Sequence, residues 1–358
     1  MNKYISLNRE QSGAIKGVLI FLIVLGHNAL FTDSLKGSFE YLYSFHVQAF
    51  FILPFLYDIQ TNKQTNSFKN SFLKNFARLY YPFLLFFIIF SVIFYITNGS
   101  SIDMNKIIEI NNNKTLYYAN VLLTGNYYLI DYYSGFQYLW FLPVMFSMCI
   151  IKENISKNKL INIIVLIIGL LSYIMFFVFM YKKPYDLKIN FTLMLFSPFA
   201  VLQGFGAYFL GRLCINIIDN SFSKIITRAC TILFLCLSIA YIVINYQGMM
   251  SRGILWTYRF IMPILFIGTL YNLKKQLAKI EFLQKLGNRS FPIYIIHPPL
   301  CAISYIICNK FLYINFLYAI IVQIAIIFIS YYVSVIWDRI TPLRKKTLPR
   351  TIEDLYIK

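Results

Sequence analysis

Long apolar runs separated by short polar segments dominate the pattern of this chain. A helix that crosses a bilayer needs about 20 mostly apolar residues. Ten runs approach that length, and no internal repeat relates them: 14–31, 41–59, 79–97, 135–151, 160–180, 191–211, 227–246, 254–273, 290–308 and 312–337. The pattern therefore predicts an all-α integral membrane protein with about ten transmembrane helices.

Lys and Arg are distributed unevenly among the segments that connect these runs. With the N-terminus in the cytoplasm, 24 of the 33 Lys and Arg residues lie in cytoplasmic segments, eight lie in external loops, and Arg259 lies within a span. Because cytoplasmic loops of membrane proteins are enriched in Lys and Arg, this bias predicts that both termini are cytoplasmic. The chain then forms one transmembrane domain, 1–358, with a long external loop at 98–134 and a short cytoplasmic tail at 338–358.

The composition narrows the class of protein further. Hydrophobic residues make up 59% of the 358 residues and charged residues only 13%, although the net charge is +19. In a soluble protein such a charge would suggest nucleic-acid binding, but here cytoplasmic loops that meet anionic lipid explain it. We therefore expect contact with membrane lipid and none with nucleic acid. The richness in Ile, Asn and Lys favours a bacterial protein of the inner membrane.

The cysteines give no sign of a metal site or of disulfides. All six lie in or at the ends of apolar runs, with no Cys-x-x-Cys pair and no spacing to His that a metal would need: Cys149, Cys214, Cys230, Cys236, Cys301 and Cys308. They are most simply small buried hydrophobic residues. We expect neither metal nor disulfide.

The first apolar run, KGVLIFLIVLGHNAL, carries a cation at one end and a histidine near the other. No small-x-small cleavage site follows Leu30, so we interpret the run as a retained helix and not as a signal peptide. Lys16 and His27 are eleven residues apart. That spacing places them on one helix face, separated by roughly 16 Å of rise.

Three histidines, His27, His46 and His297, all fall within predicted spans. A histidine in a span can simply form an interhelical hydrogen bond. It can also act as a general base, because its unperturbed pKa lies near neutrality. Ionisable residues inside a membrane are costly and often functional. His297 lies in SFPIYIIHPPL, whose prolines interrupt the helix, and broken helices in membranes usually line cavities.

Several polar or aromatic residues near the span ends have two interpretations. Lys16 and Arg78 lie at the cytoplasmic side, where they either anchor helices or bind phosphates. Arg259 either extends its charged end to the membrane surface or faces a water-filled cavity. Gln137 and Trp140 lie near the outer surface, where Trp commonly belongs to an aromatic belt. Six tyrosines of loop 98–134 form either such a belt or a platform for sugar rings: Tyr117, Tyr118, Tyr127, Tyr128, Tyr132 and Tyr133.

Taken together, these motifs resemble acyltransferase family 3, particularly its polysaccharide O-acetylases. The family's first helix has a basic residue, usually Arg, ten intervening residues and then His, and Lys16 and His27 match that spacing. Gly13 replaces an acidic residue that is common in the family. Four further segments resemble family motifs in the same order along the chain: FHVQAFFILPF, the Arg78–Pro82 segment, YLWFL and SFPIYIIHP.

The resemblance implies an O-acyltransferase that moves an acyl group, most simply acetyl, from cytoplasmic acyl-CoA to a sugar hydroxyl of an envelope glycan. It implies His27 as the catalytic base and places Lys16 and Arg78 near the donor. His46, Gln137, Trp140, Arg259 and His297 are candidates for the substrate cavity. Acetyl-CoA would be a co-substrate, and no cofactor would be bound permanently.

Two other functions fit a basic, aromatic membrane protein with a cavity. A flippase or transporter of lipid-linked sugars would be non-enzymatic, and the Lys16–His27 spacing together with the His297 motif argues against it. A glycan polymerase would ordinarily need larger external loops than this chain has.

Overall fold

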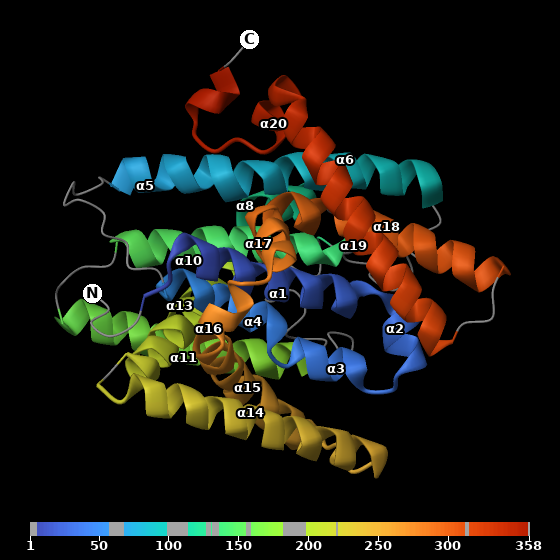
Figure 1. Ribbon diagram of the computed structural model, residues 1–358. Coiled ribbons are helices and arrows are strands. Elements are labelled where there is room, and N and C mark those ends of the chain that lie inside the picture. The colour runs from blue at the N-terminus through green and yellow to red at the C-terminus, as the bar shows by residue number, and fades with distance from the viewer. Residues whose placement is uncertain are drawn as a thin grey trace. The chain divides into compact units, whose positions relative to one another are not determined.

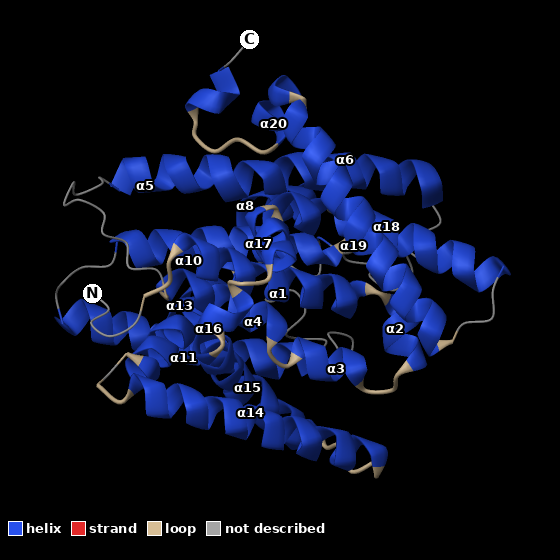
Figure 2. Cartoon of the chain, viewed as in Figure 1, coloured by secondary structure: helices blue, strands red, loops and turns tan. Residues whose placement is uncertain are grey.

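The computed structural model describes residues 6–56, 68–98, 114–126, 130, 136–154, 159–181, 198–219, 221–311 and 315–356. Every regular element among these residues is a helix (Figure 2). The chain divides into two compact units, which are described separately below. Unit 1 comprises 1–60 and 211–340, and unit 2 comprises 61–210 and 341–358.

Unit 1 combines the N-terminal part of the chain with most of its C-terminal part (Figure 1). Its helices are α1 (Arg9–His27), α2 (Ala29–Ser34), α3 (Ser38–Tyr43), α4 (His46–Ile52), the 3-10 turn η1 (Leu53–Phe55), α14 (Ser223–Tyr246), α15 (Arg252–Asn272), α16 (Lys274–Leu277), α17 (Glu281–Asn288), α18 (Ser290–Phe311) and α19 (Phe316–Arg339). Helix α1 packs against α4, α17, α18 and α19, so it is the central helix of this unit.

Unit 2 contains the middle of the chain and its C-terminal segment. Its elements are α5 (Phe68–Asn75), the π-helical turn η2 (Phe76–Tyr80), α6 (Tyr81–Asn98), α8 (Lys114–Thr124), η4 (Gln137–Trp140), α10 (Phe141–Asn154), α11 (Lys159–Tyr181), α20 (Thr341–Thr347) and η6 (Glu353–Tyr356). Helix α13 (Phe199–Ile218) crosses the boundary between the two units.

Seven helical stretches among the described residues have the length and apolar composition of membrane spans: Arg9–His27, Phe68–Ile96, Phe199–Ile218, Ser223–Tyr246, Gly253–Asn272, Ser290–Cys308 and Phe316–Arg339. A shorter apolar stretch, Leu160–Met175, lies within α11. These helices confirm the all-α membrane class. The exact number of ten spans and the cytoplasmic placement of both termini stay predictions.

The segment 41–59 was predicted as one span, but it is not a single helix. It is divided into the end of α3, then α4 and η1, because the backbone turns at Phe45 with φ −145° and ψ −32°. At this turn Tyr41 O accepts from the hydroxyl of Ser44 at 2.6 Å and from its backbone N–H at 3.1 Å. Pro54 lies within η1.

The segment predicted at 135–151 is also composite, since η4 precedes α10 there. The predicted external loop at 98–134 contains helix α8. The side chains of the six tyrosines expected to form a belt or platform lie outside the described residues, so their role stays a prediction.

Helix α1 begins at a capping box. The side chain of Asn8 accepts from Gln11 N at 2.8 Å, and the side chain of Gln11 accepts from Asn8 N at 3.3 Å. These two bonds satisfy backbone donors that the first turn of a helix leaves without partners. Beyond this cap, an apolar run that includes Leu19, Ile20 and Ile23 buries its side chains inside unit 1.

Glycines bring α1 and α17 into direct backbone contact. A Cβ added to Gly287 would lie 1.7 Å from Gly13 O, and one added to Gly17 would lie 2.0 Å from Leu283 O. Small residues allow helix backbones to approach closely in membrane proteins. The contact holds the N-terminal half of α1, including Lys16, against α17.

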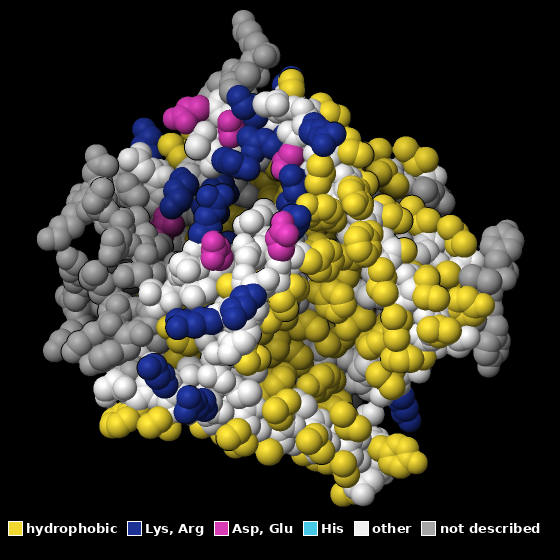
Figure 3. Space-filling view, viewed as in Figure 1, with side chains coloured by type: hydrophobic (Ala, Val, Ile, Leu, Met, Phe, Trp, Pro, Cys, Tyr) yellow, Lys and Arg dark blue, Asp and Glu magenta, His cyan; other side chains and the backbone are white. Residues whose placement is uncertain are grey.

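Apolar side chains cover the outward surfaces of α14 and α19 (Figure 3). Among the most exposed are Ile239 and Ile242 on α14 and Leu317 and Ile336 on α19, each more than half exposed. In the same view, a few Lys and Arg side chains lie around α16 and the start of α14, at the lower left. Exposed apolar helix surfaces of this kind are suited to contact with lipid.

Candidate active site

His27 is the last residue of α1, where the helix ends abruptly. Asn28 leaves the helical conformation with φ −79° and ψ 94°. Its amide donates to Ala319 O and to the side-chain oxygen of Gln323, both at 3.2 Å, and Asn28 is buried. The end of α1 is therefore fixed to α19 at the residue next to His27.

All three histidines direct one ring nitrogen to their own backbone. The Nδ1 atoms contact the carbonyl oxygens four residues earlier: Ile23 O at 2.9 Å for His27, Ile293 O at 3.0 Å for His297, and Leu42 O for His46. A carbonyl oxygen can only accept, so in each neutral ring the proton lies on Nδ1. The other nitrogen, Nε2, then carries a lone pair and can act as a base.

His27 and His297 lie side by side although 270 residues separate them in sequence. His297 Nε2 is 3.3 Å from His27 Nδ1, and the ring centroids are 5.1 Å apart. Because His297 Nε2 is an acceptor, the Nδ1 hydrogen of His27 is shared between Ile23 O and His297 Nε2. His297 thus orients the ring of His27 and can stabilise the cation that forms when His27 gains a proton.

The reactive nitrogen of His27 faces Tyr43 on α3. The Tyr43 hydroxyl donates to His27 Nε2 at 3.0 Å, so a hydroxyl group, a base and an orienting residue form one hydrogen-bonded chain. His27 and Tyr43 are both half-buried, whereas His297 is fully buried. Chemistry at this chain is therefore reachable from the His27–Tyr43 end.

His46 packs next to this chain. It is fully buried, its ring lies 4.7 Å from that of Tyr43, and its Nε2 makes no hydrogen bond to the described residues. The absent side chain of Gly26 leaves room here, since a Cβ at that position would lie 3.3 Å from His46 Nε2. His46 therefore packs against the end of α1 and against Tyr43.

The structure places the remaining sequence candidates in different surroundings. Lys16 is half-buried on α1, eleven residues before His27, so the prediction that one continuous helix carries both is confirmed. Arg259 is half-buried on α15 of unit 1. Arg78 and Trp140 belong to unit 2, as does the backbone of Gln137, whose side chain lies outside the described residues.

Arg78 lies in the π-helical turn η2, between α5 and α6. Its side chain is exposed. Short π-helical turns are rare and frequently mark functional sites. The turn, which the sequence did not predict, places the guanidinium at the start of the apolar helix α6.

The sequence analysis missed two residues that organise the site. Tyr43 and Asn28 contact His27 and α19 through the fold, and neither belongs to a motif with a recognisable spacing. Tyr43 lies three positions before His46, and Asn28 follows His27 directly, so closeness in sequence to histidines was the one available signal.

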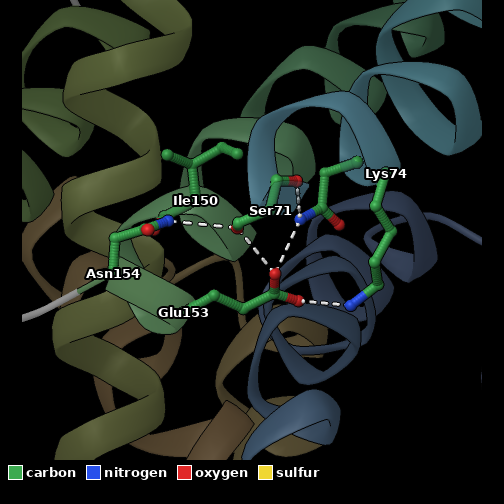
Figure 4. Close-up of polar contacts among 6 residues, drawn as sticks. Ser71, Lys74, Ile150, Glu153 and Asn154 are labelled. Atoms are coloured by element: carbon green, nitrogen blue, oxygen red, sulfur yellow. Dashed lines mark hydrogen bonds and ion pairs between the residues drawn. The ribbon is translucent and has the colours of Figure 1, made fainter. Parts of the chain in front are cut away.

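A second polar cluster lies in unit 2, where α5 meets α10 (Figure 4). Glu153 accepts hydrogen bonds from Ser71 at 2.7 Å, Lys74 at 2.9 Å and Asn75 at 3.1 Å. Asn154 donates to Ser71 at 3.0 Å. Burial alone would raise the pKa of Glu153, but the hydrogen bonds and the charge of Lys74 outweigh burial and lower it below 4.5.

The Glu153 cluster is expected to stabilise the folded protein in a pH-dependent way. Glu153→Gln should lower the free energy of unfolding by about 1–2 kcal/mol at neutral pH, because it weakens charge-assisted hydrogen bonds that are partly screened by solvent. Because the pKa of Glu153 is lower in the folded state than in the unfolded state, its ionised form stabilises the fold at pH values above the unfolded-state pKa. This stabilisation is lost as the pH falls through the folded-state pKa. The difference between variant and wild type should therefore shrink below pH 4.5.

Thermal unfolding of the detergent-solubilised protein across this pH range measures the effect. Glu281→Gln is the matched control, because Glu281 pairs with Lys285 at the surface with 78% of its side chain exposed. That variant should keep wild-type stability. Equal losses for both variants would contradict a specific role of the Glu153 cluster.

Among the described residues, no group of three or more His, Cys, Asp and Glu side chains could hold a metal ion. The six cysteines are free thiols.

These helices indicate a multi-pass membrane protein, and within it His27 is hydrogen-bonded between a tyrosine hydroxyl and a second histidine. A family model described as an acyltransferase domain matches residues 11–335, and this match spans both units. The chain therefore belongs to acyltransferase family 3 and is a membrane acyltransferase. No curated protein and no solved structure matches it.

Proposed function

We propose that this protein transfers an acyl group, most simply acetyl, from acyl-CoA to a hydroxyl of a cell-surface polysaccharide or lipid-linked sugar in the bacterial inner membrane. The observation that carries the proposal is the hydrogen bond between a hydroxyl group and His27 Nε2, with Nδ1 of the same ring directed at His297. A base that already accepts from a hydroxyl, and that a third group orients, suits O-acylation.

The reaction needs one base and no cofactor bound permanently. The acceptor hydroxyl donates its proton to His27 Nε2 as its oxygen attacks the thioester carbonyl. The carbon–sulfur bond then breaks, and the leaving thiolate of CoA takes the proton from His27. The products are an acyl ester and free CoA, and His27 is again neutral. His297 supports the cationic form of His27 in between.

The donor is expected at the cytoplasmic side, where Lys16 and Arg78 offer cations for the phosphates of CoA. The rise of α1 between Lys16 and His27 is roughly 16 Å. An extended pantetheine arm is of comparable length, so a donor held near Lys16 can present its thioester to His27. We assign His46 and Arg259 to the substrate cavity as part of the same proposal, and Gln137 and Trp140 stay candidates from the sequence.

Lys16 gives a specific prediction for donor binding. Lys16→Ala should raise the KM for acetyl-CoA by about ten-fold while kcat changes little, because a phosphate contact made equally in ground and transition states affects binding alone. Lys16→Arg should retain the wild-type KM, since Arg also binds phosphate. Steady-state kinetics of the purified protein in liposomes provides the measurement.

The matched control for Lys16 is Lys279→Ala. Lys279 is an exposed cytoplasmic-side lysine by the predicted topology and lies after α16. If its loss raised the KM as much as loss of Lys16, general surface charge and not a donor contact would be responsible.

The function itself is tested on the envelope glycans of the source bacterium. Mass spectrometry and NMR should show ester-linked acyl groups in cells with the gene and their loss in cells without it. Purified protein should in addition consume acetyl-CoA. A transporter of lipid-linked sugars would leave acetyl-CoA intact, and that result would refute the proposal.

A further inference from the structure

Helix α3 brings an exposed aromatic pair to the reactive side of His27. The ring of Phe39 lies 4.2 Å from that of Tyr43, and 44% of Phe39 is exposed. The preceding segment carries the exposed charged residues Asp33 and Lys36. Because charged side chains are stable in water and not in lipid, this part of unit 1 meets water or the membrane interface.

The Tyr43 hydroxyl occupies the position where the proposed base must receive a proton. Its oxygen lies 3.0 Å from His27 Nε2, which is the distance at which a general base accepts from its substrate. Tyr43 and His27 are both half-buried residues, whereas His297 is fully buried. Another hydroxyl group can therefore take the place of the phenol without any change in the buried half of the chain at His297.

We propose that α3 forms the acceptor subsite of this enzyme. In this proposal the Tyr43 hydroxyl is hydrogen-bonded to His27 Nε2 and excludes water from that atom until an acceptor hydroxyl replaces the phenol. The exposed ring of Phe39 receives the apolar face of the acceptor's sugar ring. The proposal rests on the proposed acyltransferase function and adds the class of ligand, the location of its subsite and a role for Tyr43.

Tyr43 favours a sugar over water because both must replace its hydroxyl at His27 Nε2. A tethered phenol is always beside His27, so a single water molecule gains little by replacing one hydrogen bond with another. A sugar gains more, because stacking on an aromatic side chain adds contact area to the same hydrogen bond. Tyr43 would thus suppress hydrolysis, in which water attacks the thioester, gives its proton to His27 and releases acetate and CoA.

Tyr43→Phe tests this role, because it removes the hydroxyl and keeps the ring. Acetate release from acetyl-CoA is measured for purified protein in phosphatidylethanolamine–phosphatidylglycerol liposomes without acceptor. Ester-linked acetate on envelope glycans is measured in a deletion strain of the source bacterium that expresses the same variant. The ratio of hydrolysis to glycan acylation should rise by about ten-fold or more, since water then occupies His27 Nε2.

Phe39→Ala tests the platform, with Leu35→Ala as its matched control. Leu35 is another exposed apolar residue just before α3, with 47% exposure and no place in the proposed subsite. Phe39→Ala should lower glycan acylation relative to acetate release by about five-fold. Leu35→Ala should change neither rate. Equal effects of the two variants would overturn the assignment of Phe39.

Failure of this proposal is distinguishable from failure of the proposed function. If His27→Gln retains wild-type acylation, the acyltransfer mechanism itself is wrong. If His27→Gln is inactive but Tyr43→Phe leaves the ratio unchanged, the role of Tyr43 is wrong and the mechanism stands. Equal loss of both rates in Tyr43→Phe, down to the level of His27→Gln, would also overturn it, because Tyr43 would then be needed for transfer itself.

Discussion

His27→Ala and His27→Gln are expected to lower acyl transfer by about 100-fold or more, in the range that general-base catalysis supplies. Gln keeps a hydrogen-bonding side chain of similar size but cannot accept a proton, so both variants should lose kcat and not donor binding. Acetyl-CoA consumption and glycan ester content are the measurements. Size-exclusion profiles should match the wild type, since His27 is half-buried at the end of α1.

His297 provides the accompanying test of the hydrogen-bonded chain. His297→Ala should lower kcat less than His27→Ala, because it removes the group that orients the base and not the base itself. In the double variant the losses should not add, as is usual for residues that act as one unit. Multiplied losses in the double variant would show that His297 acts independently of His27.

Gly287→Ala is expected to disrupt the packing of α1 against α17. Its added Cβ would lie 1.7 Å from Gly13 O, a distance that no side-chain rotation relieves because the neighbour is backbone. Overpacking of this kind should cost about 3 kcal/mol or more. Thermal unfolding of the detergent-solubilised protein should show a lower midpoint, and less protein should elute as a single folded species.

Gly253→Ala is the matched control for this effect. Gly253 also lies in a helix, α15, but the nearest atom to an added Cβ is Ser251 Oγ at 4.0 Å. Ala there should leave stability unchanged or raise it slightly, because Ala loses less backbone entropy than Gly in a helix. Equal destabilisation by both substitutions would mean that helix propensity, and not the α1–α17 contact, is being measured.

The sequence predicted the class of the protein because lipid imposes simple rules on a chain. Apolar runs long enough to cross a bilayer predict helices, and seven described stretches have that length and composition. The continuous helix that carries Lys16 and His27 followed from its apolar run and spacing. At 41–59 the same reasoning predicted one helix where there are α3, α4 and η1, since composition does not reveal the backbone turn at Phe45.

The candidate site was predicted in part. The sequence singled out His27, His46 and His297, because ionisable residues are rare in apolar runs. It placed His46 and His297 among the candidates for the substrate cavity but did not predict that the ring of His297 contacts His27. It had no means to find the cluster of Ser71, Lys74 and Glu153, since these are ordinary polar residues until α5 and α10 pack together.

By itself, the sequence determined the all-helical membrane class and the small set of side chains able to perform acid–base chemistry, because these depend on local composition and spacing. The tertiary structure decided which of them act together. The contact between His27 and His297 joins residues 270 positions apart, and the contact with Tyr43 depends on the turn before α4. Hydrogen bonds require positions within tenths of an ångström, and only the packing of helices against one another sets those positions.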